Sequence, residues 1–515
     1  MDNVKSTFFL AFVIARFAEN NDKPNALKQR KMTKDVKNHG RVYTPHFLVC
    51  IILDYGGYNS PEILQKHVID NSCGNGAFLI EIVNRYCKEY FKTNNDLQFL
   101  NYQLETFIHG IELDAKEYAS CISNLNKTVE SFGLANVRWD IMNADTLTVD
   151  KFNGRMDFVF GNPPYVRVHN LEESYDSVKK YRFAEQGMTD LFIVFFEIGF
   201  NMLADNGTMC LITPSSWLCS KAGKNLRDFI KQSNILSGVI DLGHFQPFEA
   251  TTYTLISRFQ KSNIFTEIDY NIFDDGNMKE RFVATVYMQE MCIADNFYLS
   301  DKDSLLELQK IKTAKSSRYV AVKNGFATLA DKIFIGDFDF DDGTISILKA
   351  STGKWSKCIY PYDSKGKPLT LNDFSRYGSA YNYLLENKDK LSKSRDIEDD
   401  TYWYLFGRTQ ALKDVSKMKY AINTIIKDIN SLKLEIVSEG KGLYSGLYIL
   451  TQIDFEIIQQ LLYSEDFIKY VKMLKNYKSG GYYTFASKDL EQYLNYKLTE
   501  KYGQSRISNS CWELF

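Results

Sequence analysis

The chain has 515 residues, 44% of them apolar, and a net charge of −2 at neutral pH, which predicts at least two domains with complete hydrophobic cores. Its nine cysteines include no Cys-x-x-Cys pair and no Cys/His cluster with the spacing of metal ligands, so we expect a reducing, cytoplasmic environment and no metal. The apolar run at residues 8–15 is too short to span a membrane, and no small-residue cleavage site follows it, which argues against a membrane anchor and a signal peptide.

Charge is distributed unevenly along the chain. Residues 301–515 carry 32 Lys and Arg against 28 Asp and Glu, whereas residues 1–300 carry 30 against 36. A mildly basic C-terminal half fits a surface that contacts phosphates, and ordinary variation in solvated charge explains it nearly as well. Residues 1–39 predict a helix followed by a polar, basic connector.

Predicted strands and helices alternate over residues 47–256. A helix at about 47–55 comes first, and Thr44 and Pro45 before it are typical of a helix N-terminus. The apolar patterns then predict seven strands, at 67–70, 107–111, 137–142, 156–160, 208–213, 236–241 and 252–256. Further helices are predicted between them, at 77–90, 115–131, 189–203 and 221–233. This order implies right-handed crossovers and a doubly wound α/β sheet.

Polar residues follow the first three strands. The turn from Asn71 to Gly76 comes after the first strand, and its glycines would let the backbone approach a ligand closely. The turn is neither Gly-x-Gly-x-x-Gly nor a P-loop, so a nucleotide-phosphate site is disfavoured. Glu112 ends the second strand, where an acid would bind a ribose hydroxyl pair, and Asp145 after the third could accept a hydrogen bond from an adenine amino group. Each acid alone is more often a helix cap or a turn residue, but their joint placement points to one site.

The fourth strand is followed by Gly161-Asn162-Pro163-Pro164-Tyr165. The prolines end the strand, because neither has a backbone N–H to donate, and they stiffen the turn. Asn162 is therefore held at the carboxyl end of a strand, where open α/β sheets bind ligands. Its side-chain oxygen and the Pro163 carbonyl could accept both hydrogens of an exocyclic amino group, and Tyr165 could stack on the base. The alternative is a tight turn with a structural asparagine and with Tyr165 in the core.

These motifs, in this order, resemble those of the γ-class amino-methyltransferases of DNA, specifically the TaqI-type N6-adenine enzymes. Phe248, six residues before Thr254, stands where that family places the aromatic residue of motif VIII. The resemblance is collinear over about residues 40–260, and Asn71 departs from it, because the family usually has proline there. The segments that look like motifs X, I, II, III and IV are, in that order, 40–45, 70–78, 112–114, Asp145 and 162–165.

The resemblance implies a seven-stranded Rossmann-like methyltransferase sheet, S-adenosyl-L-methionine as cofactor, and a flipped adenine in double-stranded DNA as substrate. Two acceptors on the amino hydrogens would orient the nitrogen lone pair and stabilise the developing positive charge, so no strong base is required. The catalytic positions that it implies are Asn162, Pro163, Pro164, Tyr165 and Phe248. The cofactor-binding positions that it implies are Tyr43, Thr44, Asp70, Asn71, Cys73, Gly74, Gly76, Glu112, Leu113, Asp145, Thr146 and Asn162.

The C-terminal half resembles the family's α+β target-recognition domain more loosely. Its landmarks are residues 403–410 and 479–485. Arg408 and Gln410 could read guanine and adenine edges, or they could be packing and turn residues. Four lysines recur every three residues on one predicted helix and form either a phosphate-binding stripe or a solvated face: Lys469, Lys472, Lys475 and Lys478.

The predicted organisation is an N-terminal helical extension (1–39), a catalytic domain (40–300) and a target-recognition domain (301–515). The favoured activity is N6-adenine methylation in a restriction-modification system, because Asn rather than Ser or Thr precedes Pro-Pro. The alternatives are N4-cytosine methylation, protein-glutamine methylation by an Asn-Pro-Pro-Tyr enzyme, and a non-catalytic DNA-binding subunit. No nuclease motif is found, and the residues before motif X leave no room for a nuclease domain. A cognate restriction endonuclease is therefore expected to be a separate chain, and no membrane is involved.

Overall fold

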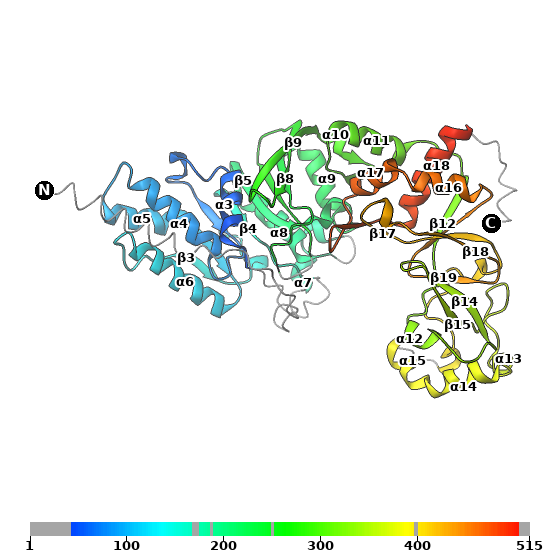
Figure 1. Cartoon of the computed structure of the whole chain (residues 1–515). Coiled ribbons are helices and arrows are strands. Elements are labelled where there is room, and N and C mark those ends of the chain that lie inside the picture. The colour runs from blue at the N-terminus through cyan, green and yellow to red at the C-terminus, as the bar shows by residue number, and fades with distance from the viewer. Residues whose placement is uncertain (1–42, 167–174, 186–188, 249–251, 396–399, 504–515) are drawn as a thin grey trace.

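The computed structural model describes residues 43–166, 175–185, 189–248, 252–395 and 400–503 (Figure 1). The extension predicted for residues 1–39, the apolar run within it and the first three residues of motif X lie outside the described residues. In the part of the chain that is described, no helix is long and apolar enough to cross a membrane.

A nine-stranded sheet forms the first half of the molecule, with the strand order β3-β2-β1-β4-β5-β7-β6-β8-β9. Strand β1 pairs in parallel with both β2 and β4, whereas β7 is antiparallel to both of its neighbours. The strands are β1 Val68–Asp70, β2 Ile108–Glu112, β3 Asp140–Asn143, β4 Met156–Gly161, β5 Leu203–Pro214, β6 Leu236–Asp241, β7 Thr254–Gln260, β8 Glu267–Asp274 and β9 Lys279–Tyr287.

The prediction of seven strands is wrong in number, because β8 and β9 extend the sheet beyond β6. The seven predicted strands are all present, and β6 has the predicted bounds. The edge strand β9 is mostly exposed and begins Lys279-Glu280-Arg281, so its sequence lacks the apolar pattern that reveals a buried strand.

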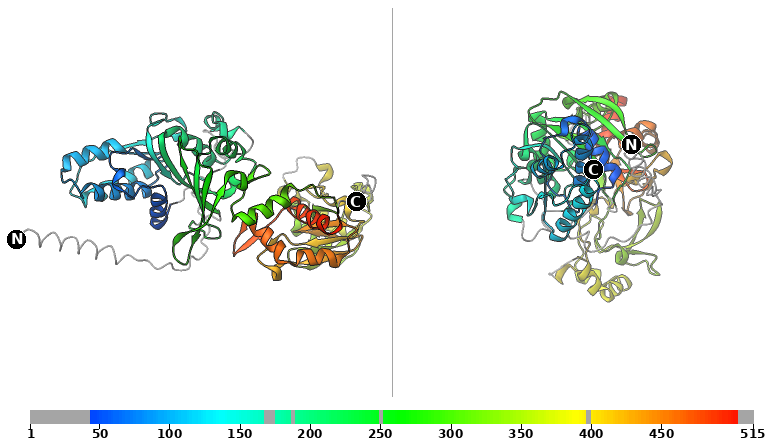
Figure 2. Two further views of the ribbon diagram at one scale, coloured as in Figure 1. Left: turned by 90° about the horizontal axis from the view of Figure 1, so that it is seen from above. Right: turned by 90° about the vertical axis from the view of Figure 1, so that its left-hand side faces the viewer.

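Helices cover both faces of the sheet, as expected for a doubly wound fold (Figures 1 and 2). Helices α3 His46–Tyr55, α4 Ala77–Tyr90, α5 Leu97–Phe107 and α6 Ala115–Glu130 enclose one apolar core with the sheet, and α8 Leu191–Met202 and α9 Lys224–Ser233 enclose the other. The sequence predicted α4 to the residue but missed α5. This helix runs directly into β2, and only the capping by Asp96, which accepts from the amides of Gln98 and Phe99, marks its start.

The second half contains three smaller sheets, with the orders β12-β20-β16-β18, β13-β15-β14-β19 and β17-β22-β21. Two short strands, β10 Cys292–Ile293 and β11 Asn296–Phe297, pair with each other before this half begins. The strands of the three sheets are β12 Val320–Asn324, β13 Ile335–Gly336, β14 Thr344–Lys349, β15 Lys354–Ile359, β16 Lys419–Ile422, β17 Ile425–Ile426, β18 Leu434–Val437, β19 Gly442–Tyr444, β20 Leu447–Thr451, β21 Tyr477–Lys478 and β22 Tyr482–Thr484. The remaining helices are α7 Tyr175–Val178, α10 Met288–Met291, α11 Lys302–Thr313, α12 Asp331–Phe334, α13 Leu371–Phe374, α14 Gly378–Glu386, α15 Lys388–Arg395, α16 Phe455–Leu462, α17 Glu465–Met473 and α18 Ser487–Tyr502.

The two halves share one apolar core. Buried Trp217 from the first half and buried Tyr470 and Tyr493 from α17 and α18 belong to the same cluster of packed side chains. The predicted boundary between residues 300 and 301 falls just before α11, which packs against α17 and α18. Figure 1 shows β14, β15 and α12–α15 as an arm that projects away from this body.

Candidate active site

The polar residues predicted from the first four strands meet at one edge of the sheet. Strands β1 to β4 are parallel, so their carboxyl ends lie together. Asp70 ends β1, and a Cβ atom on Gly161 at the end of β4 would lie only 2.9 Å from its Oδ1. The amide of Cys73 donates to the Ile111 carbonyl at 3.0 Å, which fixes the turn after β1 against β2.

The turn after β1 needs glycine at two positions for different reasons. Gly74 has φ +54°, and a Cβ there would meet no atom within 4 Å, so its backbone faces open space. Gly76 has φ +92°, and a Cβ there would lie 2.8 Å from Cys121 Sγ, so this residue permits close packing against α6. The Gly74 amide donates to Glu112 Oε2 at 2.8 Å, while the Asp114 amide donates to Oε1 at 2.8 Å. Glu112 thereby joins the turn to the end of β2.

Asp70 is only 2% exposed and accepts a hydrogen bond from the Ser72 amide at 3.0 Å. Burial raises the pKa of Asp70 to about 7, the bond from Ser72 opposes that rise, and the nearby charge of Glu112 adds to it. This carboxyl group therefore gains or loses its proton near neutral pH.

Other predicted cofactor-site residues divide into exposed and packed side chains. Leu113 is 67% exposed, an unusual position for an apolar side chain next to a cluster of acids. Thr146 is buried, and its hydroxyl donates to the Asn71 carbonyl at 2.7 Å. The Cys73 side chain is buried as well, and Asp145 accepts from the Leu147 amide at 3.0 Å. The packed residues hold the loops in place, whereas the Leu113 side chain presents an exposed apolar surface.

Motif X meets motif IV directly. Asn162 Nδ2 donates to Thr44 Oγ1 at 3.2 Å, and Ser72 Oγ lies 3.5 Å from the Asn162 carbonyl oxygen. Thr44 and Pro45 precede the helix as expected, but Pro45 and not Thr44 occupies the N-cap position of α3, and no side chain caps it. Thr44 is instead a buried partner of the asparagine amide, and Tyr43 Oη donates to Glu117 at 2.9 Å.

Three rings surround the loop after β4. Tyr165 contacts Phe192 and Phe248 edge to face, with ring centroids 6.3 Å apart and an interplanar angle of 76° in both pairs. Its hydroxyl donates to the Ile212 carbonyl at 3.4 Å, and burial raises its pKa. The predicted stacking pair, Tyr165 and Phe248, is thus brought together, but its rings touch each other and leave no parallel slot. The sequence did not reveal Phe192, because it looked like an ordinary core residue of α8.

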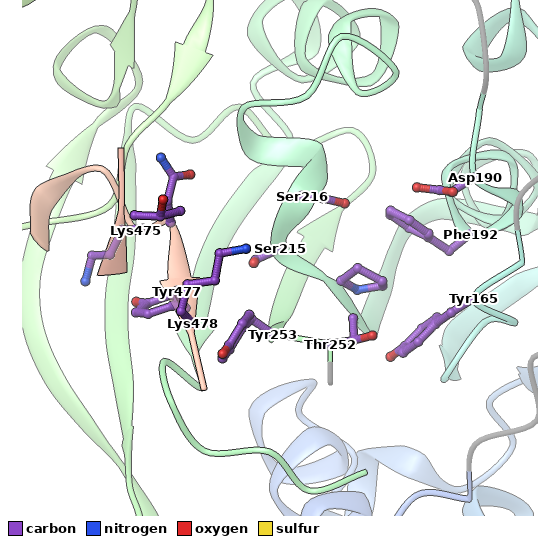
Figure 3. Close-up of a pocket in the computed structure, with 13 residues that line it drawn as sticks. Tyr165, Asp190, Phe192, Ser215, Ser216, Thr252, Tyr253, Lys475, Tyr477 and Lys478 are labelled. Atoms are coloured by element: carbon purple, nitrogen blue, oxygen red, sulfur yellow. The ribbon is translucent and has the colours of Figure 1, made fainter. Parts of the chain in front are cut away.

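A cavity of about 470 Å³ opens beside Tyr165 (Figure 3). In Figure 3, Asp190, Phe192 and Tyr165 form one side, and Tyr477 and Lys478 of β21 form the other. The complete lining is Tyr165, Asp190, Phe192, Pro214, Ser215, Ser216, Thr252, Tyr253, Lys475, Asn476, Tyr477, Lys478 and Thr484. Sequence reasoning missed most of these residues, since no motif links segments separated by more than 200 positions.

The residues predicted to contact DNA are separate from this cavity. Arg408 is exposed, and the Gln410 side-chain amide donates to the Gly325 carbonyl, so Gln410 holds its own loop in place. The predicted lysine stripe does not exist as one helix face, because α17 ends at Met473 and Lys475 has φ +55°.

One cluster contradicts the expectation that Cys and His residues do not gather like metal ligands. Side-chain atoms of His46, Cys50 and Glu81 lie within 4.8 Å of one another. Hydrogen bonds to Cys50 and Glu81 raise the pKa of His46 to about 10, which favours the protonated ring beside the Glu81 carboxylate. Arg85 Nε also donates to Glu81 at 2.9 Å. We interpret the cluster as an ion-pair network between α3 and α4.

The fold can be compared with those of known families. The sheet is the mixed α/β, mostly parallel sheet of methyltransferases, and residues 65–248 match the family model described as Eco57I restriction-modification methylase. Over that segment the chain is similar to the restriction-modification methyltransferases.

Individual proteins show the same similarity. The type II methyltransferase M.BstVI of Geobacillus stearothermophilus is 27% identical over 417 residues, which cover 69% of this chain and 73% of that protein. The restriction enzyme and methyltransferase RM.Eco57I of Escherichia coli is 23% identical in an alignment of 512 residues. That alignment covers 79% of this chain and 51%, about half, of that protein. Among solved structures, the type IIL restriction-modification enzyme MmeI in complex with DNA superimposes with a TM-score of 0.65 at 12% identity, over 89% of this chain and 68% of that one.

Proposed function

We propose that this protein transfers a methyl group from S-adenosyl-L-methionine to N6 of an adenine in double-stranded DNA, as the modification enzyme of a restriction-modification system. The observation that carries the proposal is the position of Asn162. It lies at the carboxyl end of β4, next to the turn after β1 and one short loop from the cavity beside Tyr165. An amino group held there would be adjacent to whatever occupies the glycine turn.

The sheet edge fits the proposed cofactor. Gly74 leaves open space where the methionine part would lie, and Glu112 keeps lone pairs for ribose hydroxyls although each of its oxygens already accepts an amide. The exposed side chain of Leu113 offers an apolar surface for the adenine ring, and Asp145 an acceptor for its amino group. When bound, the cofactor supplies a methyl group on a positively charged sulfur. A nearby positive charge would favour the ionised form of Asp70.

Asn162 and Pro163 would hold the target nitrogen. Asn162 Nδ2 donates to Thr44 Oγ1, which leaves Oδ1 as the acceptor of this side-chain amide. Oδ1 and the Pro163 carbonyl would accept the two hydrogens of the adenine amino group. As the nitrogen becomes bonded to a fourth group it gains positive charge, and these two acceptors stabilise that charge without a strong base.

An adenine inside a duplex must be extruded to reach this site. Tyr165 would stack on the extruded base, with Phe192 and Phe248 packed around it. The edge-to-face contact between Tyr165 and Phe248 must open to admit the base. Residues 301–515 would form the target-recognition domain, with Arg408 as an exposed candidate for reading a guanine edge.

Transfer of a labelled methyl group tests the proposal. The full chain is incubated with cofactor labelled in the methyl group and with duplex DNA, and the DNA is digested to nucleosides. We expect the label in N6-methyldeoxyadenosine, and none with Asn162→Ala. Label in N4-methyldeoxycytidine would show that the target base is cytosine and not adenine. DNA binding without any transfer would favour a non-catalytic subunit.

A further inference from the structure

The junction between the sheet and the C-terminal half contains a buried carboxylate with three partners. Asp241 ends β6 and is 5% exposed. Its Oδ2 accepts a 2.6 Å hydrogen bond from Tyr477 Oη and lies 3.5 Å from Lys475 Nζ, while its Oδ1 accepts from the Gly243 amide. Lys475 also donates to Tyr270 Oη at 3.0 Å. A buried carboxylate is costly unless it is compensated in this way, so these contacts fix residues 475–477 against the catalytic half.

Aromatic packing reinforces the same junction. The His244 ring lies 4.8 Å, centroid to centroid, from both Tyr477 and Tyr483, and Tyr253 lies 5.3 Å from Tyr477. These residues seat the β21–β22 hairpin on the loop that follows β6. Because β6 runs in the same direction as β4 and β5, that loop is at the same edge of the sheet as Asn162.

The consequence is a polar wall facing Tyr165 across the 470 Å³ cavity. Figure 3 shows the Lys478 side chain extending from β21 toward Ser215, while Asp190 lies on the opposite side near Tyr165. Lys475 has its charge engaged by Asp241, but Lys478 is exposed and has no ion-pair partner within the described ranges. Lys478 and the hydroxyls of Ser215 and Ser216 therefore line the cavity across from Tyr165 and Phe192.

We propose that Lys478, with Ser215 and Ser216, binds the phosphodiester beside the extruded nucleotide, and that Asp241 and Tyr477 are positioning residues that hold Lys478 at the cavity. The inference rests on the proposed function, since it takes duplex DNA as the partner. A base stacked on Tyr165 keeps its sugar and phosphate on the far side of the cavity, where the cation lies. A volume of about 470 Å³ is in the range of pockets that enclose a whole small ligand, which suits a nucleotide rather than a bare base.

Salt-dependent DNA binding tests the lysine. The affinity of the full chain for a fluorescein-labelled duplex that carries a mismatched adenine, which is extruded at low cost, is measured by anisotropy over a range of salt concentrations. For Lys478→Gln we expect weaker binding and a slope of log K against log salt that is smaller by about 1, as for one lost phosphate contact. The matched control is Lys472→Gln, an exposed lysine on α17 that does not line this cavity, and it should leave the slope unchanged. An unchanged slope for Lys478→Gln, or equal changes in both variants, would overturn the role of Lys478.

A double-mutant cycle tests the positioning role. Tyr477→Phe keeps the aromatic ring but removes the hydroxyl that donates to Asp241. Asp241→Asn keeps the shape of the side chain but removes its charge. We expect Tyr477→Phe to reduce the salt slope by a similar amount, and the Tyr477→Phe/Lys478→Gln double variant to bind no worse than Lys478→Gln alone. Additive losses would show that Tyr477 does not act through Lys478 and would overturn its positioning role, and thermal unfolding of each variant measures any effect on folding.

These readouts separate the two proposals. Binding does not depend on methyl transfer, so a wild-type chain that binds DNA without transferring label would refute the proposed function but not the phosphate contact of Lys478. A wild-type chain that transfers label, with an unchanged Lys478→Gln variant, would refute the phosphate contact alone.

Discussion

The proposed site has two sides that are built differently: on the cofactor side of the sheet edge, most of the polar groups come from one continuous stretch, residues 70–146, and short backbone-to-carboxylate bonds hold them. On the target side, the groups come from the loops after β4, β5 and β6 and from a hairpin near residue 480, and aromatic edges and one buried carboxylate hold them. The difference suggests that the first side is rigid before any ligand arrives, whereas the second side depends on how the two halves of the molecule pack.

The largest effect is expected for Asn162→Ala, which belongs to the target side. Removing one of two acceptors that stabilise the developing charge should lower kcat by at least about 10²–10³-fold and leave no transfer that the labelling experiment detects. Cofactor affinity, measured by calorimetry, should stay within about twofold of wild type, because the glycine turn and Glu112 are untouched. Thr44→Val is the matched variant, since it removes only the partner of Asn162 Nδ2 and should give a smaller loss. Near-normal single-turnover rates for Asn162→Ala would refute the assigned role.

The second-largest effect tests whether the cofactor side is already formed before the cofactor binds. Asp70 has a folded-state pKa near 7, well above the ordinary value of 3.8, because of its burial. Between pH 4 and pH 7 the Asp70 carboxyl therefore binds more of a proton in the folded chain than in the unfolded chain, so its contribution to stability falls as pH rises through this window and is level above it. Asp70→Asn should remove this slope and stabilise the cofactor-free protein above pH 7 by up to about 4 kcal/mol.

Denaturant unfolding across pH 4–8 measures that effect. The same substitution should weaken cofactor binding, which would show that the buried carboxylate is kept for binding at a cost in stability. A wild-type stability that rises steadily from pH 4 to pH 7, or an Asp70→Asn chain with the same slope, would contradict this reading of Asp70.

Glu112→Gln should separate the two sides more finely. The change leaves an acceptor for one of the two amides but weakens the bonds from Gly74 and Asp114, so cofactor affinity should fall by about ten- to a hundredfold. DNA affinity in the absence of cofactor should not change, since no contact of Glu112 reaches the cavity beside Tyr165. Equal losses of both affinities would show that the division between the sides is false.

The smallest effect is expected for Phe248→Leu, which keeps apolar volume but loses the ring edge against Tyr165. Capture of the extruded base should weaken by about tenfold or less, within the range that stacking on aromatic rings contributes. Fluorescence of 2-aminopurine at the target position reports extrusion directly. A signal identical to that of the wild type would show that Phe248 belongs to the core alone.

The sequence predicted the local features better than the assembled ones. Asp70, Glu112 and Asp145 stand directly after apolar strands, so parallel pairing was enough to bring them together. The loop at Asn162 was recognisable because two prolines leave few conformations. Helix α5 and strands β8 and β9 were missed, since α5 adjoins β2 without a loop and β9 is a charged edge strand.

The cavity wall at Lys478 could not be predicted at all. Its position depends on the pairing of Tyr477 with Asp241, residues that are 236 positions apart. Every-third spacing suggested that Lys478 shares a helix face with Lys469, but α17 ends before it and Lys469 instead pairs with Glu307. Long-range packing, and not periodicity, determines which of these lysines faces the cavity.

The central claim, that Asn162 holds an adenine amino group beside a bound methyl donor, can be tested most directly in living cells. The gene and its Asn162→Ala variant are expressed in a host that lacks adenine methylation, and modified bases are mapped across the genome. We predict N6-methyladenine at nearly every copy of one short sequence with the wild-type gene and none with the variant. Unmodified adenines with the wild-type gene, methylation on cytosine, or the same methylated sites with both genes would contradict it.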